Sequence, residues 1–357
     1  PRRWTHIHGD LKRKGVGLQR VFRAGEADPH PLLVVKNLQL PGQIARKTML
    51  LQRVVLTINV QQISRQVAAD REQHRDPATD AVRRIGGDVV AVKALMGPGV
   101  DPHAYRQTRS DIVALARADL VLWHGLYLEA QMESFFADLS RRSQVVAVAE
   151  TLPHELLRAH DDYVDKFDPH VWMAPEIWAR VVAETGALLN RVLPSHLGAL
   201  TANLQTYLTE IAQLHAYAAT SLATVPADQR VLVTAHDAFN YFGAAYGIEV
   251  LGIQGMSTES EAGLNRVGEL VNLLVDRQIS AVFVESSVSD RNMRALIEGA
   301  ASMGHEVRIG GQLYSDAMGP DGSYEGTYIG MIDHNITTIT RALGGQVPER
   351  GMQGLLA

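Results

Sequence analysis

From about Ile85 onward, short apolar runs alternate with segments in which apolar residues recur every three or four positions. Most of the short runs are continuous and rich in β-branched residues, which is typical of strands covered on both faces. The expected strands are Val89–Met96, Leu120–His124, Val145–Val148, Val231–Ala235, Val250–Ile253 and Ala281–Glu285. Because strands and helices alternate, the chain is predicted to be an α/β protein with mostly parallel sheets flanked by helices.

Two of the helices between these strands have recognisable start signals. We expect Ser110-Asp111 to cap a helix that runs to Ala118, and Ser289-Asp290 to cap one that ends near Gly304. The second helix carries an apolar stripe, which consists of Met293, Leu296, Ile297 and Ala300.

A longer helical pattern lies between Pro194 and Pro226, after the first group of strands and before the second. Its apolar positions are Leu197, Leu200, Leu204, Leu208, Ile211, Leu214, Ala218 and Leu222. No glycine or proline follows Gly198, so the spacing predicts one helix of about 25 residues and about 40 Å. We interpret it as a stiff connector between two groups of βα units; the alternative is a helix packed within one domain.

The first 76 or so residues do not continue this pattern. Charged and amide residues are scattered through them, the strand candidate Val54–Val60 is weak, and Asp70–Asp76 resembles a disordered linker. The start is basic, but no apolar segment follows it, so no signal peptide is visible. We predict no separate folded domain there.

Composition narrows the chemistry of any site. A chain of 357 residues is long enough for two domains, and its net charge of −5 gives no reason to expect nucleic acid as a partner. The sequence has no cysteine, which argues against disulfides, thiolate metal sites, cysteine nucleophiles and lipid attachment through cysteine. A metal would have to be held by imidazole and carboxylate, and 14 histidines make that feasible.

Two Asp-Pro-His tripeptides stand out, Asp101-Pro102-His103 and Asp168-Pro169-His170. Proline fixes the local backbone, so each histidine would be presented from a rigid loop, as a metal site requires. Two ordinary turns are the alternative interpretation, because Asp-Pro commonly starts a turn. A third copy, Asp28-Pro29-His30, lies in the irregular N-terminal stretch and is discounted.

The second half of the chain adds two candidates. His236 follows directly on the expected strand Val231–Ala235, at the end where open α/β sheets place their ligands. Asp316 follows Tyr314-Ser315. Three imidazoles and one carboxylate suit Zn²⁺, and also Mn²⁺ or Fe²⁺. Taken singly, His236 is equally well explained as a structural residue and Asp316 as part of a turn.

Four motifs in order make the sequence similar to a known family. They are Met96-Gly97-Pro98-Gly99-Val100-Asp101-Pro102-His103-Ala104-Tyr105, Asp168-Pro169-His170-Val171-Trp172, Thr234-Ala235-His236-Asp237-Ala238-Phe239 and Tyr314-Ser315-Asp316-Ala317-Met318-Gly319. From about Thr79 to Leu343 the chain resembles the metal-binding receptors of ABC importers, the TroA-like zinc/manganese family of periplasmic solute-binding proteins.

The resemblance implies two α/β lobes joined by one long rigid helix. Residues 79–193 would form the N-terminal metal-binding lobe, 194–225 the connecting helix and 226–357 the C-terminal metal-binding lobe. Residues 1–78 have no counterpart and are either disordered or wrongly assigned to this chain. In such proteins the metal lies between the lobes, so His103 and His170 would bind it from one side, and His236 and Asp316 from the other.

The resemblance also implies a function and supporting residues. The chain would be an extracytoplasmic monomer and not an enzyme; it would capture a metal ion and deliver it to an ABC permease and its ATPase. Glu285 either orients a ligating histidine or caps the next helix. Gly125-Leu126-Tyr127-Leu128-Glu129 has a counterpart near the first site. His124 stands where relatives usually carry asparagine and is interpreted as structural.

The choice of metal rests on His236. Similar manganese receptors often have glutamate there, and imidazole favours zinc, so zinc is expected first, manganese next and iron(II) last. The short His154–Asp168 segment is interpreted as a solvated acidic loop. Four protein ligands leave no open position for an activated water, which favours capture over catalysis. Two alternatives stay open: a metal-dependent hydrolase with Glu285 as its base, and a surface adhesin on the same fold.

Overall fold

The computed structural model describes residues 76–97, 99–160, 163–259 and 263–357. The Val54–Val60 strand candidate, the Asp28-Pro29-His30 tripeptide and all but the last residue of Asp70–Asp76 lie outside the described residues. Within the described part, helices and short strands alternate as an α/β fold, which confirms the predicted class. No helix of this part combines the length and the apolar character needed to cross a bilayer.

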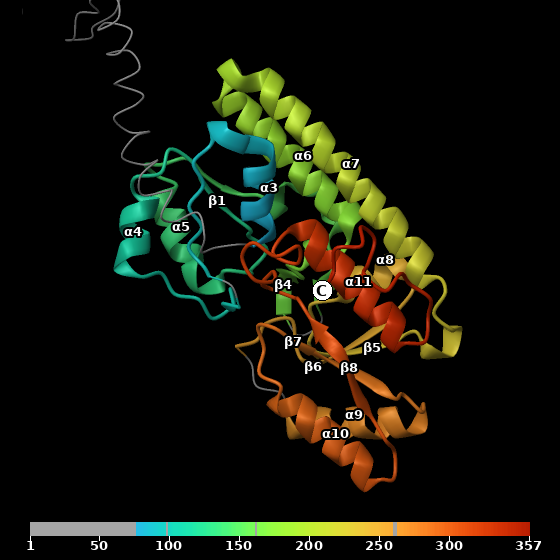
Figure 1. The fold of residues 1–357 in the computed structure, drawn as a ribbon. Helices are drawn as coiled ribbons and strands as arrows, with labels where there is room; N and C mark the ends of the chain where they lie inside the picture. The colour runs from blue at the N-terminus through green and yellow to red at the C-terminus, as the bar shows by residue number, and fades with distance from the viewer. Residues whose placement is uncertain (1–75, 98, 161–162, 260–262) are drawn as a thin grey trace, which may run out of the picture. The chain divides into compact units, whose positions relative to one another are not determined.

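The elements fall into an N-terminal half before α7 and a C-terminal half after it (Figure 1). The first half contains α3 (Pro77–Gly86), α4 (Arg109–Leu115), β1 (Val121–Trp123), α5 (Glu133–Leu139), β2 (Val145–Ala147), β3 (Ala159–His160), β4 (Tyr163–Phe167) and α6 (Pro175–Val192). The second contains β5 (Val231–His236), α8 (Asn240–Tyr246), β6 (Glu249–Gln254), α9 (Leu264–Asp276), β7 (Ala281–Glu285), α10 (Arg291–Ser302), β8 (Arg308–Leu313) and α11 (Tyr328–Ala342). Short 3-10 turns occupy Gly87–Val89, Ala130–Met132, Ala149–Thr151, His154–Leu156, Val171–Met173, Pro194–His196 and Ala227–Gln229.

Helix α7 (Leu197–Leu222) has 26 residues, as its apolar spacing predicted. It packs along α6 and α3 on the N-terminal side and against α11 and α8 on the C-terminal side (Figure 1). The buried residues Leu200, Leu204, Tyr207, Ile211 and Leu214 follow steps of three and four, so a single face of the helix supplies the contacts. The helix therefore contacts both halves, as a connector should.

The strands form parallel pairs. β1 pairs with β2, β5 with β6 and β7 with β8, all in parallel. β5 also lies against β7, so the C-terminal ends of β5, β6, β7 and β8 gather at one edge. In open α/β sheets this edge is where ligands bind.

Buried apolar side chains form one shared core and two local ones. The shared cluster runs through both halves and includes Trp178 of α6, Leu214 of α7 and Ile336 of α11. A second cluster fills the space between β5–β8 and the helices α9 and α10, and a third joins β1 to α5. The two halves are thus held together by apolar packing as well as by the covalent connection through α7.

Several sequence-based expectations on secondary structure were wrong. Val89–Met96 is not a strand: Val90 has extended backbone angles, and Val90 and Val92 pack against the core, but no neighbouring strand pairs with the segment in the described residues. The strand β8 was missed because Gly310 and Gly311 interrupt its apolar pattern. The His154–Asp168 segment contains an antiparallel pair, β3 with β4, rather than only a loop.

The helix caps also differ from those expected. Thr108, not Ser110, caps α4: its hydroxyl accepts the Asp111 N–H, and the Asp111 carboxylate accepts the Thr108 N–H. The helix ends at Leu115, three residues before the expected end. Asp290 does precede α10, but its carboxylate accepts hydrogen bonds from Arg294. Of the expected Ser289-Asp290 pair, Ser289 contributes to the cap, because its hydroxyl accepts the N–H of Arg291, the first residue of the helix. Helix α3 spans the expected boundary between residues 78 and 79; the domain limits stay a prediction.

Candidate metal centre

Strand ends place the two C-terminal candidates. His236 is the last residue of β5, and Asp316 lies three residues beyond the end of β8. The parallel register pairs His236 with Gln254 and Glu285 with Leu313, and the Glu285 carboxylate accepts the His236 backbone N–H, so the ends of the two strand pairs lie together. The strand geometry therefore brings His236 and Asp316, which are 80 residues apart, to the same edge.

Asp-Pro-His turns place the two N-terminal candidates. In each tripeptide the aspartate Oδ1 accepts the backbone N–H of the histidine two residues later, at 2.9 Å in both copies. This side-chain-to-backbone bond closes a compact turn that fixes the direction of the histidine. The two copies thus share one local structure, and the aspartate is part of it.

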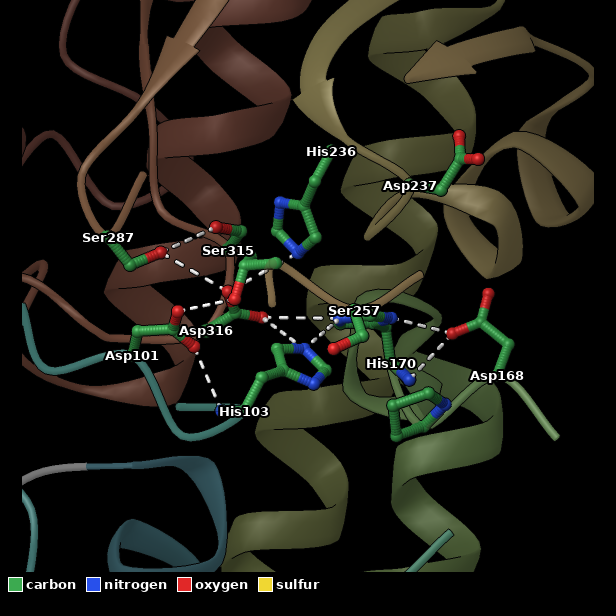
Figure 2. A network of polar contacts seen from close by, with 12 residues as sticks. Asp101, His103, Asp168, His170, His236, Asp237, Ser257, Ser287, Ser315 and Asp316 are labelled. Carbon is green, nitrogen blue, oxygen red and sulfur yellow. Dashed lines mark hydrogen bonds and ion pairs between the residues drawn. The ribbon is translucent and has the colours of Figure 1, made fainter. Parts of the chain in front are cut away.

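The four candidate side chains converge on one point (Figure 2). One nitrogen from each of His103, His170 and His236 and one oxygen of Asp316 lie within 4.8 Å of one another. The closest separations are 3.4 Å between His103 Nε2 and His170 Nε2, 3.2 Å between His170 Nε2 and Asp316 Oδ1, and 3.3 Å between His236 Nε2 and Asp316 Oδ2. All four residues are at most 4% exposed.

These separations suit a metal ion. A tetrahedral ion with bonds of roughly 2.0–2.1 Å to nitrogen and oxygen holds its ligand atoms about 3.3 Å apart. His236 Nε2 and Asp316 Oδ1 are buried, and neither meets the geometry of a hydrogen bond to another described residue. A cation among them would satisfy polar atoms whose burial is otherwise costly.

Two further carboxylates contact the Nδ1 atoms of two of the imidazoles, on the side of each ring that faces away from the centre. Asp168 Oδ1 is 2.6 Å from His170 Nδ1, and Glu285 Oε2 is 2.6 Å from His236 Nδ1. Glu285 also accepts the backbone N–H of His236, while Asp290 and not Glu285 precedes α10. Of the two roles expected for Glu285, the contacts match the orientation of a histidine.

Hydroxyl groups support the remaining candidate. Ser287 Oγ donates to Asp316 Oδ2 at 3.3 Å and lies 3.1 Å from Ser315 Oγ (Figure 2). Trp172, two residues after His170, donates its indole N–H to the Ser315 carbonyl at 3.0 Å. The Asp316 loop is therefore tied to the N-terminal half through Trp172.

Charges within the cluster shift its pKa values strongly. Burial lowers the pKa of His103 to about 3. Burial also opposes charge on His170, but the adjacent Asp168 carboxylate and Asp316 together outweigh it and raise that pKa to about 9. Glu285 and Asp316 together outweigh burial at His236 and raise its pKa, and the imidazoles hold the pKa of Asp316 well below its usual range despite its burial. The carboxylates around the centre thus favour the protonated forms of His170 and His236.

His124 lies beside the centre but not in it. Its Nε2 contacts the Pro169 carbonyl at 2.7 Å, and burial lowers its pKa to about 3. The following turn is unusual, because Gly125, Leu126 and Tyr127 all have positive φ angles, of 85°, 53° and 72°. Glu129 stabilises the turn by accepting the N–H groups of His124 and Gly125, and burial raises the pKa of Glu129 to about 7. The motif around residue 125 thus supports the second Asp-Pro-His loop, consistent with a structural His124.

Sequence reasoning named all four members of the cluster but missed part of their support. Asp168, Ser287 and the partner of Asp101, Thr258, were not assigned roles. The recurrence of aspartate two positions before a histidine was the available signal for Asp101 and Asp168. No comparable pattern marks Ser287 or Thr258.

Comparisons with known proteins agree with the fold and the motifs. A family model described as "Zinc-uptake complex component A periplasmic" (ZnuA) matches residues 75–342. The "Manganese-binding lipoprotein MntA" of Bacillus subtilis is 49% identical over 265 residues, which are 74% of this chain and 86% of that protein.

Solved structures give the same result. The periplasmic zinc binding protein TroA from Treponema pallidum superposes with a TM-score of 0.73 at 44% identity, over 75% of this chain and 96% of that one. The Fe(III)-bound YtgA from Chlamydia trachomatis gives a TM-score of 0.69 at 27% identity, over 76% of this chain and 96% of that one. These relatives are binding proteins and not enzymes, as was expected of this chain. The chain therefore belongs to the ZnuA family of metal-binding substrate-binding proteins, as its four motifs indicated.

Proposed function

We propose that this protein captures a single divalent transition-metal ion with His103, His170, His236 and Asp316 and delivers it to an ABC permease outside the cytoplasm. The observation that carries the proposal is the convergence of these four buried side chains within 4.8 Å. Two ligands come from each half, so the ion would be enclosed between the halves. The names of the relatives, which bind manganese, zinc or iron and include a lipoprotein and a periplasmic protein, support both the cargo and the location.

We infer that zinc is the preferred ion and manganese the next. Three neutral imidazoles and one carboxylate favour zinc over manganese, and the general order of divalent affinities points the same way. Iron(II) would follow. The ion is bound and released unchanged, and the permease dimer with its ATPase is the proposed recipient.

The hydrolase alternative gains no support from the contacts. A hydrolase would need a free base beside the metal, and Glu285 is engaged with both the ring and the backbone N–H of His236. Its position matches that of a carboxylate that orients a metal ligand. The adhesin alternative rests on the fold alone, and no particular contact favours it.

Elemental analysis and competitive titration test the capture site. Purified protein should contain one equivalent of metal, and adding Zn²⁺ or Mn²⁺ to the metal-free form should raise its melting temperature. Asp316→Ala should abolish this shift, whereas His196→Ala, which removes an exposed histidine before α7, should not. A wild-type protein without bound metal and without a shift would refute the proposal.

Delivery needs a separate measurement. Vesicles that contain the permease and ATPase should accumulate radioactive zinc or manganese only when the loaded receptor and ATP are both supplied. A receptor that binds metal but supports no uptake would restrict the proposed function to binding.

A further inference from the structure

The three imidazoles of the centre are not held equally. His170 and His236 each have a carboxylate oxygen 2.6 Å from Nδ1. His103 Nδ1 is buried as well, but among the described residues it has neither a carboxylate oxygen within ion-pair distance nor a hydrogen-bond partner. The orientation of the His103 ring therefore depends on the turn that carries it.

The turns that carry the two N-terminal histidines also differ in their anchoring. Asp168 accepts a hydrogen bond from Asn240 Nδ2 at 3.2 Å, and its backbone carbonyl accepts one from the Tyr241 hydroxyl at 3.0 Å. Trp172 adds a bond to Ser315. Several groups of the C-terminal half thus hold the loop of His170.

The loop of His103 has one such anchor in the described residues. It lies in the stretch between Val89 and α4, whose described residues form no strand, and Gly99 and Ala104 on either side of the tripeptide are exposed. Asp101 closes the turn through Oδ1, and its other oxygen, Oδ2, accepts a hydrogen bond from the Thr258 hydroxyl. Thr258 follows β6, so a side chain of the opposite half holds the carboxylate that shapes the His103 turn.

A second contact crosses between the halves beside the first. Gln131 Nε2 donates to both carboxylate oxygens of Glu259, at 2.8 and 3.0 Å. This pair is exposed, and it does not touch the turn that carries His103. The Gln131–Glu259 contact therefore also joins the two halves, but unlike the Thr258–Asp101 contact it is not connected to a proposed metal ligand.

We propose that Thr258 and Asp101 act as positioning residues, which hold His103 on the metal and thereby set the rate at which the metal is released. This inference rests on the proposed function. When the Thr258–Asp101 contact breaks, His103 is the ligand with no other side chain to keep its ring in place, so it leaves the ion first. The ion then remains on His170, His236 and Asp316 and is open to exchange on the side of the departed imidazole.

Release rates test the inference. The zinc-loaded protein is mixed with excess chelator, and dissociation is followed by stopped flow for the wild type, Thr258→Val and Thr258→Ser. Valine keeps the shape and removes the hydroxyl, so release should accelerate on the order of tenfold, the effect of losing a hydrogen bond to a charged group. Serine restores the hydroxyl and should bring the rate back near that of the wild type.

Two controls separate positioning from a general loosening of the halves. Gln131→Ala removes the neighbouring exposed contact and should leave the rate close to wild type, because exposed polar contacts contribute little. In a His103→Ala background, Thr258→Val should add no further acceleration, since the two changes act through the same ligand.

The possible outcomes are distinct. Wild-type release by Thr258→Val, fast release by Thr258→Ser, or equal acceleration by Gln131→Ala would each overturn the positioning role and leave the receptor function intact. A wild-type protein that binds no zinc at all would overturn both proposals.

Discussion

The N-terminal and C-terminal halves place their ligands by different means. His236 and Asp316 sit at or just beyond the ends of β5 and β8, where the hydrogen-bonded register of parallel strands fixes their height. His103 and His170 lie on loops, and in each case an Asp-Pro-His turn sets the direction of the ring. A strand end is held by a whole sheet, whereas a loop is held by the few side chains that reach it.

This difference between strand ends and loops shows which parts of the structure keep each proposed ligand in place. His236 shares its strand with buried residues along its whole length, while the loops depend on Asp101 and Asp168. Ligands on strand ends should therefore tolerate changes in neighbouring side chains, and ligands on loops should respond to them. Four measurements can break or sharpen this contrast.

Removal of a ligand should have the largest effect. Asp316→Ala deletes the only carboxylate among the four proposed ligands, and His103→Ala deletes an imidazole. Zinc affinity, measured by competition with a chelator, should fall by more than the roughly 10- to 100-fold that loss of a supporting residue causes. Unchanged affinity in both variants would mean that the metal binds elsewhere.

Removal of an orienting carboxylate should come next. Asp168→Asn and Glu285→Gln should each weaken zinc binding about 10- to 100-fold, because each weakens the contact to Nδ1 of a ligand. If loops respond more than strand ends, Asp168→Asn should have the larger effect. Glu298→Gln, a change of an exposed glutamate on α10, is the matched control.

Acidification should weaken metal binding. Without metal the pKa of His170 is about 9, so at neutral pH this imidazole is protonated and the metal must displace the proton. Protons compete more strongly as pH falls, so zinc affinity should drop about tenfold per pH unit for each proton displaced. His103, with a pKa of about 3, should release none at neutral pH.

Calorimetry in buffers of different ionisation enthalpy counts the displaced protons. Asp168→Asn should reduce the count, because Asp168 is the carboxylate that contributes most to the raised pKa of His170. A count of zero in the wild type would contradict the raised pKa of His170.

Ser287→Ala should have the smallest effect. It removes a hydroxyl that donates to Asp316 Oδ2 at 3.3 Å, while the strand end of β8 and the bond from Trp172 to Ser315 still place the loop. We expect zinc affinity to fall by only a few-fold, about 1 kcal/mol, because this hydrogen bond is long and Asp316 keeps its contacts to His170 and His236. A loss as large as that in Asp168→Asn would remove the contrast between strand ends and loops.

Sequence patterns predicted most of the helices and strands because buried positions recur at regular spacing along the sequence. The strands near residues 121, 145, 231, 250 and 281 are continuous apolar runs, and the long helix α7 shows its buried face in steps of three and four. The pattern failed where pairing or packing decides the outcome. Val89–Met96 has the composition of a strand but no partner strand among the described residues, whereas β8 has a partner strand but lacks a strand-like composition.

The candidate site was predictable for a different reason. Its four members lie in four recognisable motifs, so a resemblance could name them without any knowledge of distance. Thr258 and Ser287 have no such mark, because their importance arises only when distant segments meet, across 157 residues for Asp101 and Thr258. Sequence patterns alone cannot show which threonine will contact a residue that is distant in the sequence.

The core that runs through both halves has a thermodynamic consequence. Trp178, Leu214 and Ile336 belong to one cluster although they come from α6, α7 and α11. Exposing this cluster in one half would expose it in the other, so the halves should melt in a single cooperative transition in calorimetry. A metal ion bound between the halves would then stabilise both of them at once. The melting temperature of the protein would therefore show whether its metal site is occupied.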